Sequence, residues 1–293
     1  MKVKIIGNGA WGNALCNVLK ENCSSVSIWN KSEKIDDADI FVIALHTQAI
    51  RSVLTLIASQ KKYITIVNAS KGIEQTTHKL PFQIATELFM SGLDYFCLTG
   101  PSFANEVIRK MPTMVNLGYT QSKNKEVVKN LFQTDYFEVR LVKGVMALEI
   151  ASAFKNIYAI LCGFADGIGF GTNTRVKLII LAIEEFYRMY KKLHLELDIT
   201  LIPGTIGDLI LTCNSTESRN FRFGKILTKN SAKESLHKIG NTVEGYYSVS
   251  SVPHFVNKHG VELPLALLGG EIVMEDDIAK KKKKFLAFIK QVR

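Results

Sequence analysis

The chain has 293 residues, of which 47% are hydrophobic and 22% are charged, a composition that is ordinary for a globular protein large enough for two domains. Its net charge of +10 is concentrated in residues 279–293, which hold seven cations and no acid and leave the rest of the chain at +3. The charge therefore does not indicate a nucleic-acid partner. We expect the tail to be a solvated terminal helix, with contact to an anionic membrane or RNA as the alternative.

Short apolar runs alternate with amphipathic segments in the first half of the chain. The runs expected to be strands are Lys2–Ile6, Val26–Trp29, Ile40–Leu45, Tyr63–Asn68, Tyr95–Leu98, Met114–Leu117 and Phe137–Leu141. The segments expected to be helices are Trp11–Glu21, Thr47–Ser59, Leu80–Ser91 and Lys123–Phe132. This alternation predicts an α/β domain over residues 1–142, with a Rossmann-like, doubly wound and mostly parallel sheet.

Helical periodicity dominates after residue 142. The expected helices span residues 145–164, 174–193, 204–213, 220–236, 243–259 and 270–292. The pattern predicts an all-α C-terminal domain over residues 143–293. Because Glu149 and Lys155 interrupt the first of these helices, we expect no transmembrane segment.

The cysteines and the N-terminus indicate a cytoplasmic protein. The five cysteines are scattered and show no metal-ligand spacing, which argues against a disulfide scaffold and against a metal site. The first residues run directly into a structural motif, and no signal peptide is visible.

That motif is a glycine-rich turn, Gly7-Asn-Gly-Ala-Trp-Gly12, between the first strand and the first helix. In such a turn Gly7 permits the tight bend, Gly9 lets the backbone approach a pyrophosphate, and Gly12 lets the helix pack closely on the strand. The helix N-terminus offers unpaired N–H groups to phosphates. The turn predicts a dinucleotide cofactor, NADPH or NADH.

The second strand does not end in the acid that usually binds the ribose of NAD. Trp29 is followed by Asn30 and Lys31, and a lysine at this place favours the 2′-phosphate of NADP. Alternatively, Lys31 is an exposed loop residue. The connection Asn30–Asp39 is also shorter than most parallel crossovers, which puts the binding of the adenosine half in question.

Lys155 lies in one of the most apolar helical stretches, with the small residues Ala151, Ser152 and Ala159 one turn away. A buried ammonium is costly without a partner. Either this lysine extends to the surface, or the small neighbours leave room for a ligand to reach it.

Several motifs together resemble the NAD(P)-dependent glycerol-3-phosphate dehydrogenases of bacteria. They are Gly-Asn-Gly-Ala-Trp-Gly (7–12), Asn-Ala-Ser-Lys-Gly-Ile-Glu (68–74), Gly-Pro-Ser-Phe-Ala-Asn-Glu (100–106), Ala-Phe-Lys-Asn-Ile-Tyr-Ala-Ile (153–160), Gly-Asp-Leu-Ile-Leu-Thr-Cys (207–213), Ser-Thr-Glu-Ser-Arg-Asn-Phe-Arg-Phe-Gly (215–224) and Val-Glu-Gly (243–245). The resemblance implies reduction of dihydroxyacetone phosphate to sn-glycerol 3-phosphate for phospholipid synthesis, by a homodimer.

The resemblance also implies roles for individual residues. Lys155 would be the catalytic proton donor and acceptor. The cofactor would contact Gly7, Gly9, Trp11, Gly12, Lys31, Lys71, Ala104, Arg219 and Glu244. The substrate would contact Lys71, Gly100, Ser102, Lys155, Asp208, Ser218, Arg219 and Asn220. Taken without the resemblance, Asp208 is a helix N-cap, Glu244 an exposed acid at a helix start, and Trp11 a packing residue.

Two alternatives stay open. The chain could be another two-domain hydroxyacid dehydrogenase, which is expected to lack the Ser218-Arg219-Asn220 phosphate clamp. It could also be a degenerate cofactor-binding protein whose basic tail binds membrane or nucleic acid, which the short connection after Trp29 favours.

Overall fold

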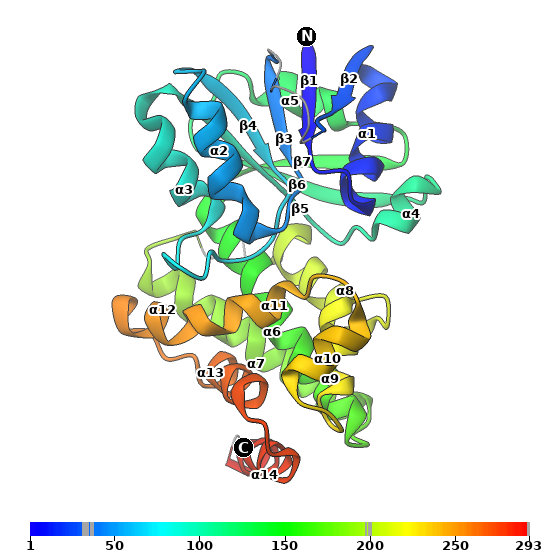
Figure 1. Cartoon of the computed structure of the whole chain (residues 1–293), viewed down its shortest axis with the longest axis vertical. Coiled ribbons are helices and arrows are strands. Elements are labelled where there is room, and N and C mark those ends of the chain that lie inside the picture. The colour runs from blue at the N-terminus through cyan, green and yellow to red at the C-terminus, as the bar shows by residue number, and fades with distance from the viewer. Residues whose placement is uncertain (31–34, 36–37, 197, 199–200, 292–293) are drawn as a thin grey trace. The chain divides into compact units, whose positions relative to one another are not determined.

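The chain forms two compact units in a computed structural model that describes residues 1–30, 35, 38–196, 198 and 201–291 (Figure 1). Unit 1 consists of Met1–Lys71, Lys79–Ile150 and Leu201–Gly207. Unit 2 consists of Gly72–His78, Ala151–Thr200 and Asp208–Arg293. The functional boundary at residue 142 stays a prediction.

Unit 1 is built on a seven-stranded sheet with the order β2-β1-β3-β4-β5-β6-β7. The strands are β1 (Lys2–Ile6), β2 (Ser25–Ile28), β3 (Ile40–Ile43), β4 (Ile64–Asn68), β5 (Leu93–Thr99), β6 (Thr113–Tyr119) and β7 (Phe137–Lys143). All neighbours pair in parallel except β5 and β6. The predicted Rossmann-like, mostly parallel sheet is confirmed.

Helices cover both faces of this sheet. The helices are α1 (Ala10–Asn22), α2 (Ile50–Ala58), α3 (Pro81–Phe89), α4 (Ala104–Ile108) and α5 (Lys125–Phe132), with short 3₁₀ turns η1 (Thr47–Ala49) and η2 (Met90–Gly92). Alternate strand residues such as Phe96 and Leu98 share a core with α1, α4 and α5, while the opposite side of β4 and β5 packs on α3. Tyr95 faces α3, because its ring contacts Phe82.

The shortened connection does not disrupt the sheet. Residues 29–39 link β2 to β3, and both strands pair in parallel with β1, which lies between them. The doubly wound strand order is therefore kept.

Unit 2 is helical, as predicted. Its helices are α6 (Val145–Gly167, which begins in unit 1), α7 (Thr172–Lys192), α8 (Asp208–Asn214), α9 (Arg219–Ile226), α10 (Ala232–Ile239), α11 (Glu244–Ser248), α12 (Val252–His259), α13 (Pro264–Met274) and α14 (Ile278–Gln291), with the 3₁₀ turn η5 (Val249–Ser251). The π-helical turn η4 (Pro203–Gly207) precedes α8 and belongs to unit 1.

Two predicted helices are each split by a non-helical segment in the structure. The predicted helix 220–236 breaks before α10, where Ser231 and Glu234 form a reciprocal capping box. The predicted helix 270–292 breaks before α14, where the Asp277 carboxylate accepts hydrogen bonds from the N–H groups of Ala279 and Lys280. In both places a side chain satisfies the exposed N–H groups of a new helix start.

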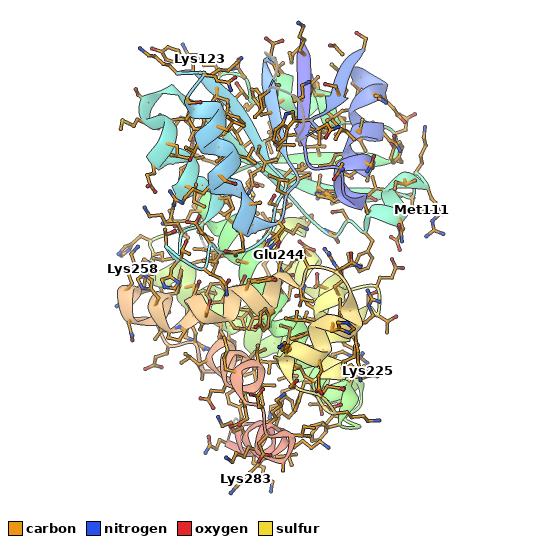
Figure 2. All side chains as sticks on the ribbon, viewed as in Figure 1. Met111, Lys123, Lys225, Glu244, Lys258 and Lys283 are labelled. Carbon is orange, nitrogen blue, oxygen red and sulfur yellow. The ribbon has the colours of Figure 1, made fainter. Side chains whose placement is uncertain are left out.

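The C-terminal helix is not solvated on every side, so that expectation was wrong for one face. Lys281 and Phe285 are fully buried, and the Lys281 ammonium donates to the carbonyl of Asn230 at 3.0 Å. The Phe285 ring packs on Phe164 at 5.4 Å. Lys283 lies on the exposed side of α14 (Figure 2).

Among the described residues, α6 is long and apolar enough to cross a membrane, and 94% of its apolar window is buried inside the fold. Burial of this kind is expected of a core helix. It is also the helix that carries Lys155.

Candidate active site

The glycine-rich turn of unit 1 has the close contacts that only glycine allows. Gly7 has φ +131°, and a Cβ there would lie 2.2 Å from the carbonyl oxygen of Ala44. A Cβ on Gly12 would lie 2.0 Å from the carbonyl oxygen of Gly7. Open space surrounds the Cβ position of Gly9, so a phosphate can approach the backbone there.

The N-terminus of α1 fits the phosphates of a dinucleotide. Gly9 is its N-cap, no side chain bonds the first N–H groups, and the first turn carries no acid, so the helix presents donors and a positive dipole end. The Trp11 indole donates to the carbonyl of Ala69 at 3.2 Å, which ties this turn to the end of β4. Lys31 lies outside the described residues.

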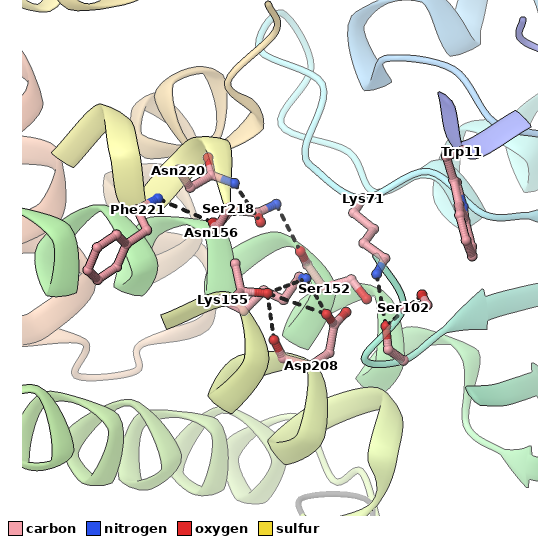
Figure 3. A network of polar contacts seen from close by, with 12 residues as sticks. Trp11, Lys71, Ser102, Ser152, Lys155, Asn156, Asp208, Ser218, Asn220 and Phe221 are labelled. Carbon is pink, nitrogen blue, oxygen red and sulfur yellow. Dashed lines mark hydrogen bonds and ion pairs between the residues drawn. The ribbon is translucent and has the colours of Figure 1, made fainter. Parts of the chain in front are cut away.

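A second cluster forms at the carboxyl ends of β4 and β5 in unit 1. The carbonyl of Gly100 accepts hydrogen bonds from the Lys71 ammonium at 3.3 Å and from the Ser102 hydroxyl at 3.0 Å (Figure 3). Ala104 is the first residue of α4. The structure thus brings Lys71, Gly100 and Ser102 together at the sheet edge where doubly wound folds bind ligands.

Lys155 is buried, with only 5% of its surface exposed, so the alternative that it extends to the surface is wrong. Its ammonium lies 2.5 Å from a carboxylate oxygen of Asp208 and donates to the hydroxyl of Thr212 at 2.9 Å (Figure 3). Ala151 and Ser152 beside it are buried as well. A buried ion pair with additional hydrogen bonds satisfies both charges.

Asp208 and Thr212 lie one turn apart on α8. The Thr212 hydroxyl donates to the backbone carbonyl of Asp208 at 2.6 Å, which orients its oxygen to accept from Lys155. Thr212 was not among the residues predicted from the sequence. Its spacing of four residues from Asp208 on a predicted helix was the available signal.

The predicted phosphate clamp surrounds the start of α9. Ser218 is the N-cap and accepts from the N–H of Phe221 at 3.2 Å. Arg219 is exposed; desolvation of its covered part lowers the pKa of the guanidinium, and the charge of Glu244 opposes this effect. Glu244 is half-buried at the first position of α11 (Figure 2).

Asn220 belongs to an amide network that connects three helices. Its side-chain NH₂ donates to the Asn156 carbonyl oxygen at 2.9 Å, and its own oxygen accepts from the N–H of Gly245 at 2.9 Å. Asn156 in turn donates to the backbone carbonyl of Ser152 at 3.2 Å (Figure 3). Asn156, which was also not predicted from the sequence, links the start of α9 to the helix of Lys155.

Two glycines allow α6 and α9 to touch through their backbones. A Cβ on Gly163 would lie 1.9 Å from the carbonyl oxygen of Phe221, and one on Gly224 would lie 1.9 Å from that of Ile160. This close approach places the Ser218–Asn220 segment against the helix that carries Lys155. Among the described residues, no group of three or more His, Cys, Asp or Glu side chains is placed to hold a metal ion.

The sequence is similar to known proteins along most of its length. The C-terminal profile of NAD-dependent glycerol-3-phosphate dehydrogenase matches residues 144–281, and the N-terminal profile matches residues 2–35 and 30–126. A glycerol-3-phosphate dehydrogenase (NAD(P)+) from Staphylococcus epidermidis is 32% identical over 316 aligned positions, which cover 94% of each chain. This chain belongs to the NAD-dependent glycerol-3-phosphate dehydrogenase family.

Other members agree with this assignment. The family relative from Staphylococcus haemolyticus is 31% identical and covers 97% of each chain. The crystal structure of a glycerol-3-phosphate dehydrogenase from Coxiella burnetii has the same fold, with a TM-score of 0.90, 24% identity and 98% coverage of each chain. The two segments of the N-terminal profile match meet at residues 30–35, at the shortened connection. The resemblance inferred from the motifs is confirmed.

Proposed function

We propose that this protein is an NAD(P)H-dependent glycerol-3-phosphate dehydrogenase that reversibly reduces dihydroxyacetone phosphate to sn-glycerol 3-phosphate for glycerophospholipid biosynthesis. The observation that supports it best is the buried Lys155–Asp208–Thr212 cluster in a chain of this family. Glycerol 3-phosphate, the compound in the family's name, is a phosphorylated secondary alcohol, so the substrate of the reduction is the matching ketone.

Reduction of a ketone requires a proton donor at the carbonyl oxygen, where negative charge develops. When bound, the nicotinamide cofactor supplies the hydride. Lys155 donates its proton from Nζ to the carbonyl oxygen, while Asp208 and Thr212 hold the ammonium in place. In the reverse direction the neutral amine of Lys155 takes the hydroxyl proton.

The other predicted residues are assigned as binding residues. We propose that the cofactor contacts Gly7, Gly9, Trp11, Gly12, Lys31, Lys71, Ala104, Arg219 and Glu244, and that the substrate contacts Lys71, Gly100, Ser102, Asp208, Ser218, Arg219 and Asn220, besides Lys155. Asn156 supports this set through Asn220. Arg219 suits a phosphate because its planar guanidinium can donate two parallel hydrogen bonds.

The test is oxidation of NADPH and NADH in the presence of dihydroxyacetone phosphate, with identification of the product as sn-glycerol 3-phosphate. Non-phosphorylated 2-keto acids serve as the comparison substrates. Turnover with the keto acids alone would establish the hydroxyacid dehydrogenase alternative. Cofactor binding without turnover of either class would establish the degenerate alternative. Of the two cofactors, we expect NADPH to be used better, because of Lys31.

We further propose a cytoplasmic homodimer that binds no nucleic acid, with a cofactor domain over residues 1–142 and a substrate domain over residues 143–293. The support is the resemblance to the family. Analytical ultracentrifugation of the purified protein measures the oligomeric state, and a sedimentation coefficient that corresponds to a monomer at micromolar concentration contradicts the dimer.

A further inference from the structure

Glu149 is a buried carboxylate that the function proposed above does not use. It lies on α6 within unit 1 and only 2% of its surface is exposed. One oxygen accepts hydrogen bonds from the Asn68 side chain at 2.8 Å and the Tyr95 hydroxyl at 2.5 Å, and the other accepts from the N–H of Phe82 at 2.9 Å. Three donors from three different elements therefore converge on one carboxylate.

No cation is among these partners. Burial raises the pKa of Glu149 to about 7, although the three hydrogen bonds lower it. The titratable groups that face it from β5 are Tyr95 and Cys97, whose pKa values are raised by burial and by the charge of Glu149. Lys71 follows β4 and is near enough to act on Cys97. The Asn68 NH₂ group and the Phe82 N–H can only donate, so these two contacts favour the ionised carboxylate.

Asn68 connects Glu149 to the turn after β4 through further hydrogen bonds. Its side-chain oxygen accepts from the N–H of Ser70 at 3.0 Å, and its NH₂ group also reaches the carbonyl of Ser70 at 3.3 Å. The Ser70 hydroxyl donates to the carbonyl of Ile43 and accepts from the N–H of Leu45 at 3.0 Å. The turn is thus anchored to the end of β3.

The next residue in the chain is Lys71, whose ammonium reaches the carbonyl of Gly100. We propose that Glu149 is a positioning residue for Lys71: its carboxylate orients Asn68, and Asn68 fixes the turn that directs Lys71 toward the Gly100–Ser102 segment. The consequence for catalysis rests on the proposed role of Lys71 in binding substrate and cofactor.

A carboxylate is needed at this place because the Asn68 NH₂ group and the Phe82 N–H, which can only donate, lie on different oxygens. Glutamine has one oxygen and one NH₂ group, so in Glu149→Gln one of these two donors faces another donor. Protonation of the carboxyl removes the negative charge and weakens the charge-assisted hydrogen bonds from the same donors. The position of Lys71 therefore depends on the charge of Glu149, and a one-proton change near pH 7 is expected in the parent protein alone.

Glu185 offers a matched control. It is also fully buried, and its carboxylate also accepts from three donors, namely Tyr158, Leu265 and Ala266. It differs from Glu149 in that the Arg188 guanidinium lies 3.7 Å away. It belongs to unit 2, whereas the Asn68–Lys71 turn belongs to unit 1. Glu185→Gln therefore removes a buried carboxylate but leaves the hydrogen bonds of Glu149 and Asn68 unchanged.

The first test does not depend on turnover: amide hydrogen exchange of the segment 68–71 in the ligand-free protein. We expect exchange at Ser70 and Lys71 to rise about 10-fold or more in Glu149→Gln, as local opening becomes easier, and to stay at the parent level in Glu185→Gln. Unchanged exchange in Glu149→Gln overturns the proposal, whether or not dihydroxyacetone phosphate proves to be the substrate.

The second test is a double-mutant cycle with Lys71→Met. In the parent background Glu149→Gln should lower kcat/KM for dihydroxyacetone phosphate about 10- to 100-fold, mainly through KM, as misplacement of a binding group does. In the Lys71→Met background the same change should cost less than about 3-fold. Equal losses in both backgrounds overturn the positioning role.

The dependence of kcat/KM on pH distinguishes a positioning role of Glu149 from a purely structural one, which would not change it. The ratio of kcat/KM between parent and Glu149→Gln should increase as the pH rises through about 7, because only the parent gains an ionised carboxylate there. The substrate phosphate titrates identically in both proteins and cancels in the ratio. A ratio independent of pH contradicts the proposal. Absence of turnover in the parent contradicts the proposed function and leaves the exchange test decisive.

Discussion

Helix α6 carries two buried charges, six residues apart, that are stabilised in different ways. Lys155 in unit 2 forms an ion pair with Asp208, whereas Glu149 in unit 1 is held by three neutral donors. A carboxylate partner favours the protonated form of a lysine, which a proton donor requires. Burial raises the pKa of Glu149 to about 7, so the charge of this carboxyl depends on the pH near neutrality.

Removing Lys155 should have the largest effect. Lys155→Met is expected to lower kcat by at least about 10³-fold, because the developing oxyanion loses its proton donor, while the dissociation constant of NADPH stays near the parent value. Stopped-flow oxidation of NADPH and a fluorescence titration measure the two quantities. Lys281→Met is the control, since that lysine is equally buried but donates to the Asn230 carbonyl; a comparable loss of kcat there contradicts a specific role for Lys155.

Asp208→Asn tests how much the same ion pair contributes to the stability of the fold. It leaves the Lys155 ammonium buried without its countercharge, which is expected to lower the free energy of unfolding by about 3 kcal/mol. Urea unfolding measures this value. Asp166→Asn removes the partner of Lys225 in a partly exposed pair and should cost less than about 1 kcal/mol. Equal losses in the two variants are incompatible with the buried pair described for Lys155.

Glu185→Gln should change how stability depends on pH. Burial raises the pKa of Glu185 to about 7, from 4.5. Between these values the unfolded chain ionises this carboxyl while the folded chain keeps it protonated, so the folded state loses stability as the pH rises from about 4.5 to 7, by up to about 3 kcal/mol.

The variant lacks this loss, so its stability relative to the parent should be greater at about pH 8 than at about pH 5. Urea unfolding at both pH values measures the difference. Glu184→Gln, at the exposed neighbouring position of α7, should show the same difference from the parent at both pH values. A Glu185→Gln curve parallel to that of the parent argues against a protonated carboxyl in the folded state.

Arg219→Lys should have the smallest of these effects. A lysine keeps the charge but loses the bidentate geometry, so KM for dihydroxyacetone phosphate should rise about 10-fold with kcat nearly unchanged. Arg188→Lys, at a half-exposed position of α7 where the guanidinium pairs with Glu184 and Glu185, should leave KM unchanged. A change in kcat alone for Arg219→Lys would falsify the assignment of this residue to substrate binding.

The sequence was sufficient to predict the parts of the molecule that depend on local patterns. Alternating apolar runs predicted the strands, and the glycine spacing at residues 7–12 predicted the turn, because each depends on residues close together in the chain. The capping box of Ser231 and Glu234, which splits a predicted helix, was also readable as a local motif.

Tertiary pairings could not be predicted in this way. Asn156 meets Asn220 across 64 positions of the chain, and Asn68 meets Glu149 across 81. Contacts at such sequence separations produce no periodic pattern in a single sequence. Likewise, composition does not separate the buried Lys281 from its four exposed or half-exposed neighbours in the lysine run 280–284. Which lysine is buried depends on how α14 packs.

The most direct test of the difference between the two buried charges is a steady-state comparison of Lys155→Met and Glu149→Gln with dihydroxyacetone phosphate at about pH 8. We predict that Lys155→Met loses kcat by at least about 10³-fold, and that Glu149→Gln raises KM about 10-fold or more while kcat stays within about 3-fold of the parent. The two charges of α6 do not have the separate roles assigned to them if both variants change the same parameter, kcat or KM. The same conclusion follows if Lys155→Met turns over at the parental rate.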